Sequence, residues 1–292
     1  MESIIKNQIK LQSENGRLEA IISPEEGGRL VALKYADYDI IKATSIDEYG
    51  QNFASAILFP FANRVNKGSY EFEGKTYQLK CNENLRNNAL HGLVFDKKFR
   101  TERVRNSDGH SSVELVYQSD ENLTGFPFSF KITLNYSLNN NDLSLGIAIE
   151  NTDTKSFPFT LGWHPYFYSN KLKDASVTFN SKNIVEQDSN QITSSLKPFK
   201  GSAHIKLGSI HLDNAYELND NQVIFLTPDY KVTLDTFGQK SYLQLFTPED
   251  GSSIAIEPMT GVSNSFNNNL GLKVLRPNEV FHTRCALKIE IP

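Results

Sequence analysis

The stretch that decides the fold is FSFKITLNYSLNNNDLSLGIAI, residues 128–149. Its apolar residues occupy every second position from Phe128 to Leu138 and again from Leu143 to Ile149. Alternation with a period of two is typical of strands that bury one face, and the three asparagines between the two halves are typical of a turn. The stretch therefore predicts two long antiparallel strands of the kind that build a β-sandwich.

Shorter segments with the same alternation lie on both sides of this pair. Turn residues at 25–28 and 36–37 separate short strands, and Glu73-Gly74 joins the two halves of a hairpin between residues 69 and 79. The aromatic stretch 157–167 contains glycine and two prolines, so it favours neither a helix nor a long strand. Helical periodicity is scarce, and no repeat or linker marks a boundary. We expect one all-β domain over residues 1–292, a large antiparallel β-sandwich.

Composition limits the kind of partner. Of the 292 residues, 39% are hydrophobic and 22% are charged, which is sufficient for a packed core. The formal net charge of -4 and the absence of a Lys/Arg run argue against nucleic acid or an anionic membrane as the main partner. A neutral small molecule is the expected partner.

The cysteines and the apolar runs bear on location. Cys81 and Cys285 are too few for a disulfide scaffold and too far apart for a metal-binding pair, so two reduced thiols are expected. The N-terminus has no apolar core of signal-peptide length, and no segment approaches the roughly 18 apolar residues of a membrane span. We expect a cytoplasmic protein, and both a monomer and a homodimer remain open.

The segment SIAIEPMTG, residues 253–261, carries a candidate base. A period of two sends Glu257 to the face opposite Ile254 and Ile256. Pro258 lacks an N–H group, so the strand is expected to end there, with Glu257 as its last paired residue. On this segment alone, a solvent-exposed glutamate that closes an ordinary strand is the simpler interpretation.

Two of the six histidines stand in unusual settings. His91 precedes Gly92, which predicts a turn, and His164 lies between Trp163 and Pro165. Neither has a metal-ligand spacing to a neighbour, so no metal or other cofactor is expected. Two alternatives remain open. Both histidines and Glu257, which are far apart in sequence, could converge in space on a His₂Glu metal site, or each histidine could have a structural role.

Five short segments form a joint pattern along the chain. They are Asn63-Arg64 with the hairpin that follows, Leu90-His91-Gly92, residues 162–167, Leu212-Asp213, and residues 256–261. In order and spacing they resemble the aldose 1-epimerase (galactose mutarotase) family. The resemblance implies that family's large antiparallel β-sandwich, the galactose mutarotase-like supersandwich, with a sugar in an open cleft.

The resemblance also implies an isomerase that interconverts the α and β anomers of a free aldohexose. It makes Glu257 the base, His164 the general acid and His91 a partner at the ring oxygen, with Arg64, Asp213 and Asn63 as sugar-binding residues. A glutamate is ionised at neutral pH, and a carboxylate near His164 is expected to raise the pKa of that histidine, so one acid and one base suffice. Leu93 departs from the double glycine that many members carry after the first histidine, which leaves the substrate open.

Two other functions remain open. A hexose-6-phosphate epimerase of the same fold would need a cationic clamp, for which the candidates are Arg86, Lys97, Lys98 and Arg100. We favour the interpretation that these are solvated loop charges. A carbohydrate-binding sandwich without catalysis would need no acid and base pair. Trp163, the only tryptophan, is expected to anchor the core, although a sugar-stacking role is the alternative.

Overall fold

Strands form most of the regular structure in the computed structural model, which describes residues 7–107, 110–119, 123–238 and 241–291. The predicted hairpin is present as β12 (Phe130–Asn139) and β13 (Asp142–Asn151), with every residue of one strand paired to one of the other. Their inward side chains are buried and the alternate ones are partly exposed, as the sequence periodicity requires.

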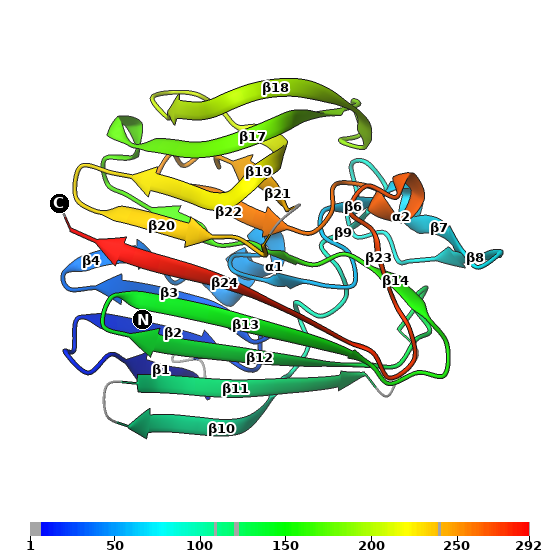
Figure 1. The fold of residues 1–292 in the computed structure, drawn as a ribbon, viewed down its shortest axis with the longest axis horizontal. Coiled ribbons are helices and arrows are strands. Elements are labelled where there is room, and N and C mark those ends of the chain that lie inside the picture. Colours follow the sequence, from blue (N-terminus) through cyan, green and yellow to red (C-terminus); the bar gives the residue numbers. More distant parts are fainter. Residues whose placement is uncertain (1–6, 108–109, 120–122, 239–240, 292) are drawn as a thin grey trace.

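These two strands belong to a large antiparallel sheet that curves across the molecule (Figure 1). In spatial order its main path is β10 (Arg100–Ser107), β11 (His110–Ser119), β12, β13, β24 (Val280–Glu290), β20 (Lys231–Asp235), β19 (Asp213–Leu226), β21 (Tyr242–Phe246), β22 (Ser253–Met259), β15 (Gly162–Trp163) and β5 (Ile57–Leu58). Three further strands attach to it: β16 (Tyr166–Tyr168) pairs with β22, and β17 (Ser176–Gln187) pairs with both β18 (Thr193–Lys206) and β19.

A second antiparallel sheet packs on the first and makes the sandwich. Its strands, in order, are β1 (Ile9–Gln12), β2 (Leu18–Ser23), β3 (Arg29–Tyr35) and β4 (Tyr38–Ile41). Side chains of this sheet share one apolar cluster with those of β11 to β13. The Tyr136 hydroxyl donates a hydrogen bond of 2.9 Å to the carbonyl oxygen of Gly28, which ties the two layers together.

Small elements gather at one end of the sandwich (Figure 1). They are the pairs β6 (Arg64–Val65) with β9 (Ala89–Leu90), β7 (Ser69–Phe72) with β8 (Lys75–Gln78), and β14 (Phe157–Phe159) with β23 (Lys273–Leu275), together with the helix α2 (Ser265–Asn268). Short 3₁₀ helices lie at Asn66–Gly68 and Leu172–Asp174.

The helix α1 (Ile46–Asn52) starts at a capping box. The Ser45 hydroxyl accepts from the Glu48 N–H, and the Glu48 carboxylate accepts from the Ser45 N–H at 2.7 Å. Its last turn closes on Phe53, whose φ of 55° is in the left-handed region. Tyr49 and Phe53 are buried against a small apolar cluster that includes Leu58 of β5, so α1 is fixed over the end of the large sheet.

The structure confirms the predicted fold class, the hairpin at Glu73-Gly74 and the scarcity of helix. The stretch 157–167 is divided among β14, β15 and β16, so it is indeed neither a helix nor a long strand. Trp163 is fully buried, which agrees with its expected place in the core and removes it from any sugar-stacking surface.

Candidate active site

A cavity of about 580 Å³ lies between α1 and the end of the large sheet. Side chains of β16, β19, β21 and β22 line it on the sheet side, and residues 42–44 and α1 line it opposite. All six residues proposed from the sequence are among its lining residues: Asn63, Arg64, His91, His164, Asp213 and Glu257. The fold therefore brings together residues that are almost 200 positions apart in the chain.

Glu257 lies on the cavity face of β22, while Ile254 and Ile256 point into the apolar core, as their alternation predicts. Its side chain is only 2% exposed. The interpretation of an ordinary solvated glutamate is therefore wrong. Burial of a carboxyl group without a full set of partners costs free energy, so this position is unusual for a purely structural residue.

The strand does not end at Pro258, contrary to the sequence prediction. Glu257, Pro258 and Met259 all pair with β21, so Glu257 lies within the ladder. On the other side of β22, the Ile256 N–H donates to the carbonyl oxygen of Pro165, between β15 and β16, and the Thr260 N–H donates to that of Leu161, just before β15. The N–H group that Pro258 lacks would point to this same side, between those of Ile256 and Thr260. Its absence therefore leaves the pairing of β22 with β21 intact.

His164 sits between β15 and β16 and is fixed through its backbone. Its N–H donates to the Ala56 carbonyl oxygen at 3.1 Å, and its carbonyl oxygen accepts from the Ser55 N–H at 2.8 Å. The imidazole stacks on the Tyr166 ring, with 5.0 Å between centroids. Its Nε2 lies 3.4 Å from Oε1 of Glu257, so the proposed acid and base are in direct contact.

His91 occupies the turn that the sequence predicts. Its φ is 62°, and its N–H donates to the Asn63 carbonyl oxygen at 2.9 Å. A Cβ at Gly92 would meet the Phe59 backbone at 2.4 Å, so only glycine fits there. The His91 ring lies between Phe53 and His164, at centroid distances of 4.8 and 5.0 Å.

Burial controls the protonation of His91, His164 and Glu257. Burial lowers the pKa of His164 to about 4 and holds the pKa of His91 well below its usual value. Burial, and after it the negative charge of Asp213, raises the pKa of Glu257 well above the usual carboxyl value. The expected upward shift at His164 is therefore wrong in sign, because loss of water around the imidazole lowers its pKa by more than a backbone hydrogen bond raises it. Both directions favour a His164–Glu257 pair that is uncharged and holds one proton.

Several buried polar atoms of the site lack a hydrogen-bond partner within the described part of the chain. They are Nδ1 of His91, Nδ1 of His164 and Oε2 of Glu257. Such atoms are rare in folded proteins, and they are common where a bound molecule supplies the missing partner.

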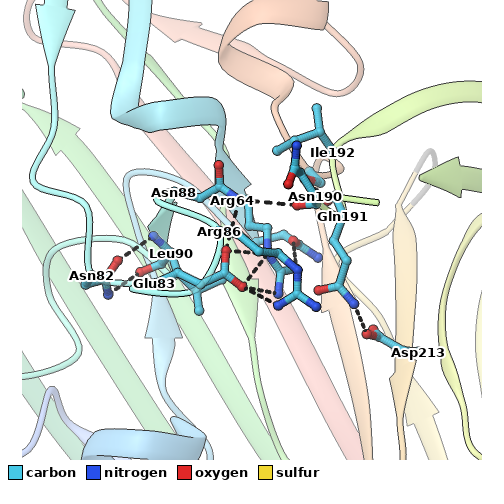
Figure 2. Close-up of polar contacts among 12 residues, drawn as sticks. Arg64, Asn82, Glu83, Arg86, Asn88, Leu90, Asn190, Gln191, Ile192 and Asp213 are labelled. Atoms are coloured by element: carbon cyan, nitrogen blue, oxygen red, sulfur yellow. Dashed lines mark hydrogen bonds and ion pairs between the residues drawn. The ribbon is translucent and has the colours of Figure 1, made fainter. Parts of the chain in front are cut away.

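The proposed sugar-binding residues form one polar chain beside this pair. Arg64 donates from Nη1 to Oδ1 of Asn63 at 3.0 Å, and Asn63 donates to Oε1 of Gln244 at 3.4 Å. Gln244 in turn donates to Oδ1 of Asp213 at 2.8 Å. Gln191, at the tip of the β17–β18 hairpin, donates to the second carboxylate oxygen of Asp213 (Figure 2). These hydrogen bonds hold the Asp213 carboxylate and the Arg64 guanidinium at opposite ends of one wall of the cavity.

Sequence reasoning missed Gln244, Gln191 and Glu83, the ion-pair partner of Arg64. Gln244 is detectable in principle, because it interrupts the apolar run Tyr242–Phe246 of a strand whose residues are otherwise aromatic or aliphatic. Gln191 and Glu83 stand in polar loops, where nothing in the local sequence distinguishes them from solvated residues.

The arrangement bears on the metal and phosphate alternatives. Among the described residues, no three His, Cys, Asp or Glu side chains are arranged to hold a metal ion, although His91, His164 and Glu257 are neighbours. None of the four candidate clamp cations lines the cavity, and each forms an ion pair with a carboxylate. These cations are Arg86, Lys97, Lys98 and Arg100.

A family model described as Aldose 1-epimerase matches residues 8–288, nearly the whole chain. The chain belongs to the aldose 1-epimerase family. Among its relatives, Uncharacterized protein YihR of Escherichia coli K12 is 24% identical over 270 residues, which cover 87% of this chain and 86% of YihR. Galactose mutarotase of Sus scrofa is 27% identical over 212 residues, which cover 67% of this chain and 59% of the mutarotase.

Solved structures support the fold of this aldose 1-epimerase family member. A galactose mutarotase-like protein from Clostridium acetobutylicum superposes with a TM-score of 0.87 at 22% identity, over 98% of this chain and 95% of the other. Galactose 1-epimerase from Lactobacillus acidophilus gives a TM-score of 0.78 at 18% identity, over 100% and 97% of the two chains. The predicted galactose mutarotase-like sandwich is thereby confirmed. No helix in the described residues is long and apolar enough to cross a membrane.

Proposed function

We propose that the protein is an aldose 1-epimerase that interconverts the α and β anomers of a free aldohexose by opening and reclosing the sugar ring. The observation that carries the proposal is the buried contact between Nε2 of His164 and Oε1 of Glu257 in the wall of a sugar-sized cavity. A carboxylate and an imidazole are the acid and base that this reaction needs.

The proposed reaction is a proton exchange with no net change. In the reactive form Glu257 is a carboxylate and His164 is protonated. Glu257 takes the proton from the C1 hydroxyl while His164 gives its proton to the ring oxygen, so the C1–ring oxygen bond breaks and an open-chain aldehyde forms. After rotation about the C1–C2 bond, the same two transfers run backwards on the other face of the aldehyde. The pair holds one proton throughout.

Burial has a useful consequence for this step. Ring opening converts a charged pair into protonated Glu257 and neutral His164. These are the forms that burial favours, because it raises the pKa of the carboxyl group and lowers that of the imidazole. Loss of solvent therefore favours ring opening from the charged pair, and reclosure regenerates that pair. His91, which burial also keeps neutral, stands beside His164 as a hydrogen-bond partner for the ring oxygen.

The charges of the cavity support a free sugar over a phosphate ester. Its described lining residues include five carboxyl side chains but only two cations, Lys42 and Arg64, and Arg64 is already paired with Glu83. A phosphate dianion would meet net negative charge there. Sugar hydroxyl groups, in contrast, can hydrogen-bond to Asp213, Asn63 and Arg64 without a charge penalty.

A polarimetric assay tests the proposal. Freshly dissolved α-galactose or α-glucose is followed with and without the protein, and the protein should accelerate the approach to the equilibrium rotation. If the protein bound these sugars without acceleration, it would be a carbohydrate-binding sandwich and the proposed catalysis would be wrong.

A further inference from the structure

Arg64 is held by Glu83, a residue to which no catalytic or sugar-binding role has been given above. Its Nε lies 3.1 and 3.0 Å from the two carboxylate oxygens of Glu83, and its Nη2 lies 2.9 Å from Oε1 (Figure 2). Arg64 and Glu83 expose only 13% and 10% of their side chains. A fork of this kind fixes both the position and the plane of a guanidinium group.

The fork leaves part of the guanidinium free for a ligand. An arginine has five N–H groups, and three of those of Arg64 are used by Glu83 and Asn63. The other two have no hydrogen-bond partner among the described residues, and the arginine lines the cavity. Glu83 itself does not line the cavity, so it acts from behind Arg64.

Glu83 is itself held firmly. Asn88, which is fully buried, donates to Oε2 of Glu83 at 2.9 Å, and Arg86 donates to Oε1 at 3.1 Å. Glu83, Arg86 and Asn88 belong to the loop 82–90, whose ends are joined by two hydrogen bonds. The Asn82 side chain donates to the Leu90 carbonyl oxygen at 3.0 Å and accepts from the Leu90 N–H at 2.7 Å. Leu90 pairs with Arg64 across β6 and β9, so the loop and the arginine form one unit.

We propose that Glu83 is a positioning residue for sugar binding, which sets the orientation of Arg64 so that its two free N–H groups address a sugar hydroxyl. This inference rests on the proposed function, because it assigns Glu83 to the same sugar site. Sugar affinity then depends on Glu83 although this carboxylate touches no sugar.

The charge of Glu83 is required as well as its shape. Burial acts to raise the pKa of Glu83, but the hydrogen bonds and charge of Arg64, with Asn88 and Arg86, outweigh it and lower the pKa. In Glu83→Gln, an amide NH₂ group would replace one acceptor oxygen and would face N–H donors of Arg64 or Asn88. The fork would be lost, and the guanidinium would turn toward other acceptors.

The test measures galactose and glucose binding by calorimetry, together with kcat and KM for mutarotation. We expect Glu83→Gln to raise Kd and KM by about 10-fold or more with a much smaller change in kcat, since tenfold is about 1.4 kcal/mol of binding. Glu83→Asp keeps the charge but shortens the reach, so it should recover part of the affinity. Glu102→Gln is the matched control, because it makes the same change in an ion pair, with Arg100, whose two residues do not line the cavity. It should change Kd less than twofold.

A double variant separates positioning from a general structural effect. In an Arg64→Met background the guanidinium is absent, so adding Glu83→Gln should weaken sugar binding no further. Additive losses in the double variant, or equal losses in Glu83→Gln and Glu102→Gln, would overturn the role of Glu83.

The two proposals can fail separately. A wild-type protein that binds aldoses without accelerating mutarotation contradicts the proposed function, and the Kd series still decides the role of Glu83. A wild-type protein that binds no aldose overturns both.

Discussion

Nε2 of His164 and Oε1 of Glu257 lie 3.4 Å apart, and both side chains are almost completely buried. Neither residue has another side-chain hydrogen bond within the described residues that would fix its proton, since Nδ1 of the histidine and Oε2 of the glutamate have no partner. The pair is thus free to exchange protons with a bound molecule.

Glu257→Gln should lower kcat by about 10² to 10⁴-fold, because the amide keeps the shape of the side chain and removes the base. Galactose binding should persist, which calorimetry can measure beside the polarimetric rate. Glu249→Gln is the control, since Glu249 lines the same cavity but is exposed. Retention of most of the wild-type turnover would remove Glu257 from the mechanism.

His164→Gln should also lower kcat, because protonation of the ring oxygen belongs to the same transition state. The measurement is kcat and KM from polarimetric progress curves at several sugar concentrations. An increase in KM with unchanged kcat would make His164 a ligand instead of an acid.

The activity should decrease at high pH, where the pair loses its one proton. In the uncharged pair this proton is on Glu257, and without it His164 has no proton to give to the ring oxygen. Burial together with Asp213 raises the pKa of Glu257, so the high-pH limb lies well above 4.5. Asp213→Asn removes the negative charge that raises this pKa and should move the high-pH limb of kcat/KM to lower pH. A wild-type profile without this limb, or a limb that stayed in place in the variant, would contradict the assignment.

Stability should respond to the low pKa of His164. An unfolded histidine has a pKa of about 6.5, and that of folded His164 is about 4. Its contribution to stability is therefore present above pH 6.5 and is lost as the pH falls toward 4. Because His164→Gln lacks this loss, the Tm of the variant minus the Tm of the wild type should increase as the pH is lowered from 7 to 4. A constant Tm difference would contradict the assigned protonation.

Glucose should be a better substrate than glucose 6-phosphate, because carboxyl groups outnumber cations in the cavity wall. The measurement is kcat/KM for both compounds. A 100-fold preference for the ester, about 2.7 kcal/mol of transition-state binding, would refute the free-sugar proposal. In that case Lys42→Met, which changes a lining cation, should abolish the preference, and Arg100→Met should not.

Local periodicity was sufficient to predict the fold class. The alternation at residues 128–149 predicts strands whatever surrounds them, because one face must be buried. Pro258 shows the limit of such rules. Its missing N–H ends a strand only where a partner would need it, and the structure places it between the donor positions of Ile256 and Thr260. The single-domain assignment for residues 1–292 stays a prediction.

The site was predictable only in part. The residues assigned by resemblance all line the cavity, while their catalytic and binding roles remain proposals. The direction of the His164 pKa shift could not be deduced from its neighbours in sequence, because it depends on how completely other segments exclude water. Glu83 could not be found either, since its partner Arg64 is 19 residues away and a loop glutamate is usually solvated.

The backbone that holds His164 joins three distant parts of the chain. The histidine is hydrogen-bonded through its own N–H and carbonyl to Ala56 and Ser55, and the next residue, Pro165, accepts from the N–H of Ile256. Contacts between positions so far apart form late when a chain refolds, because long loops must close first. Recovery of turnover after dilution from denaturant should therefore lag behind recovery of the strand signal in circular dichroism, which makes catalysis a reporter of complete renaturation.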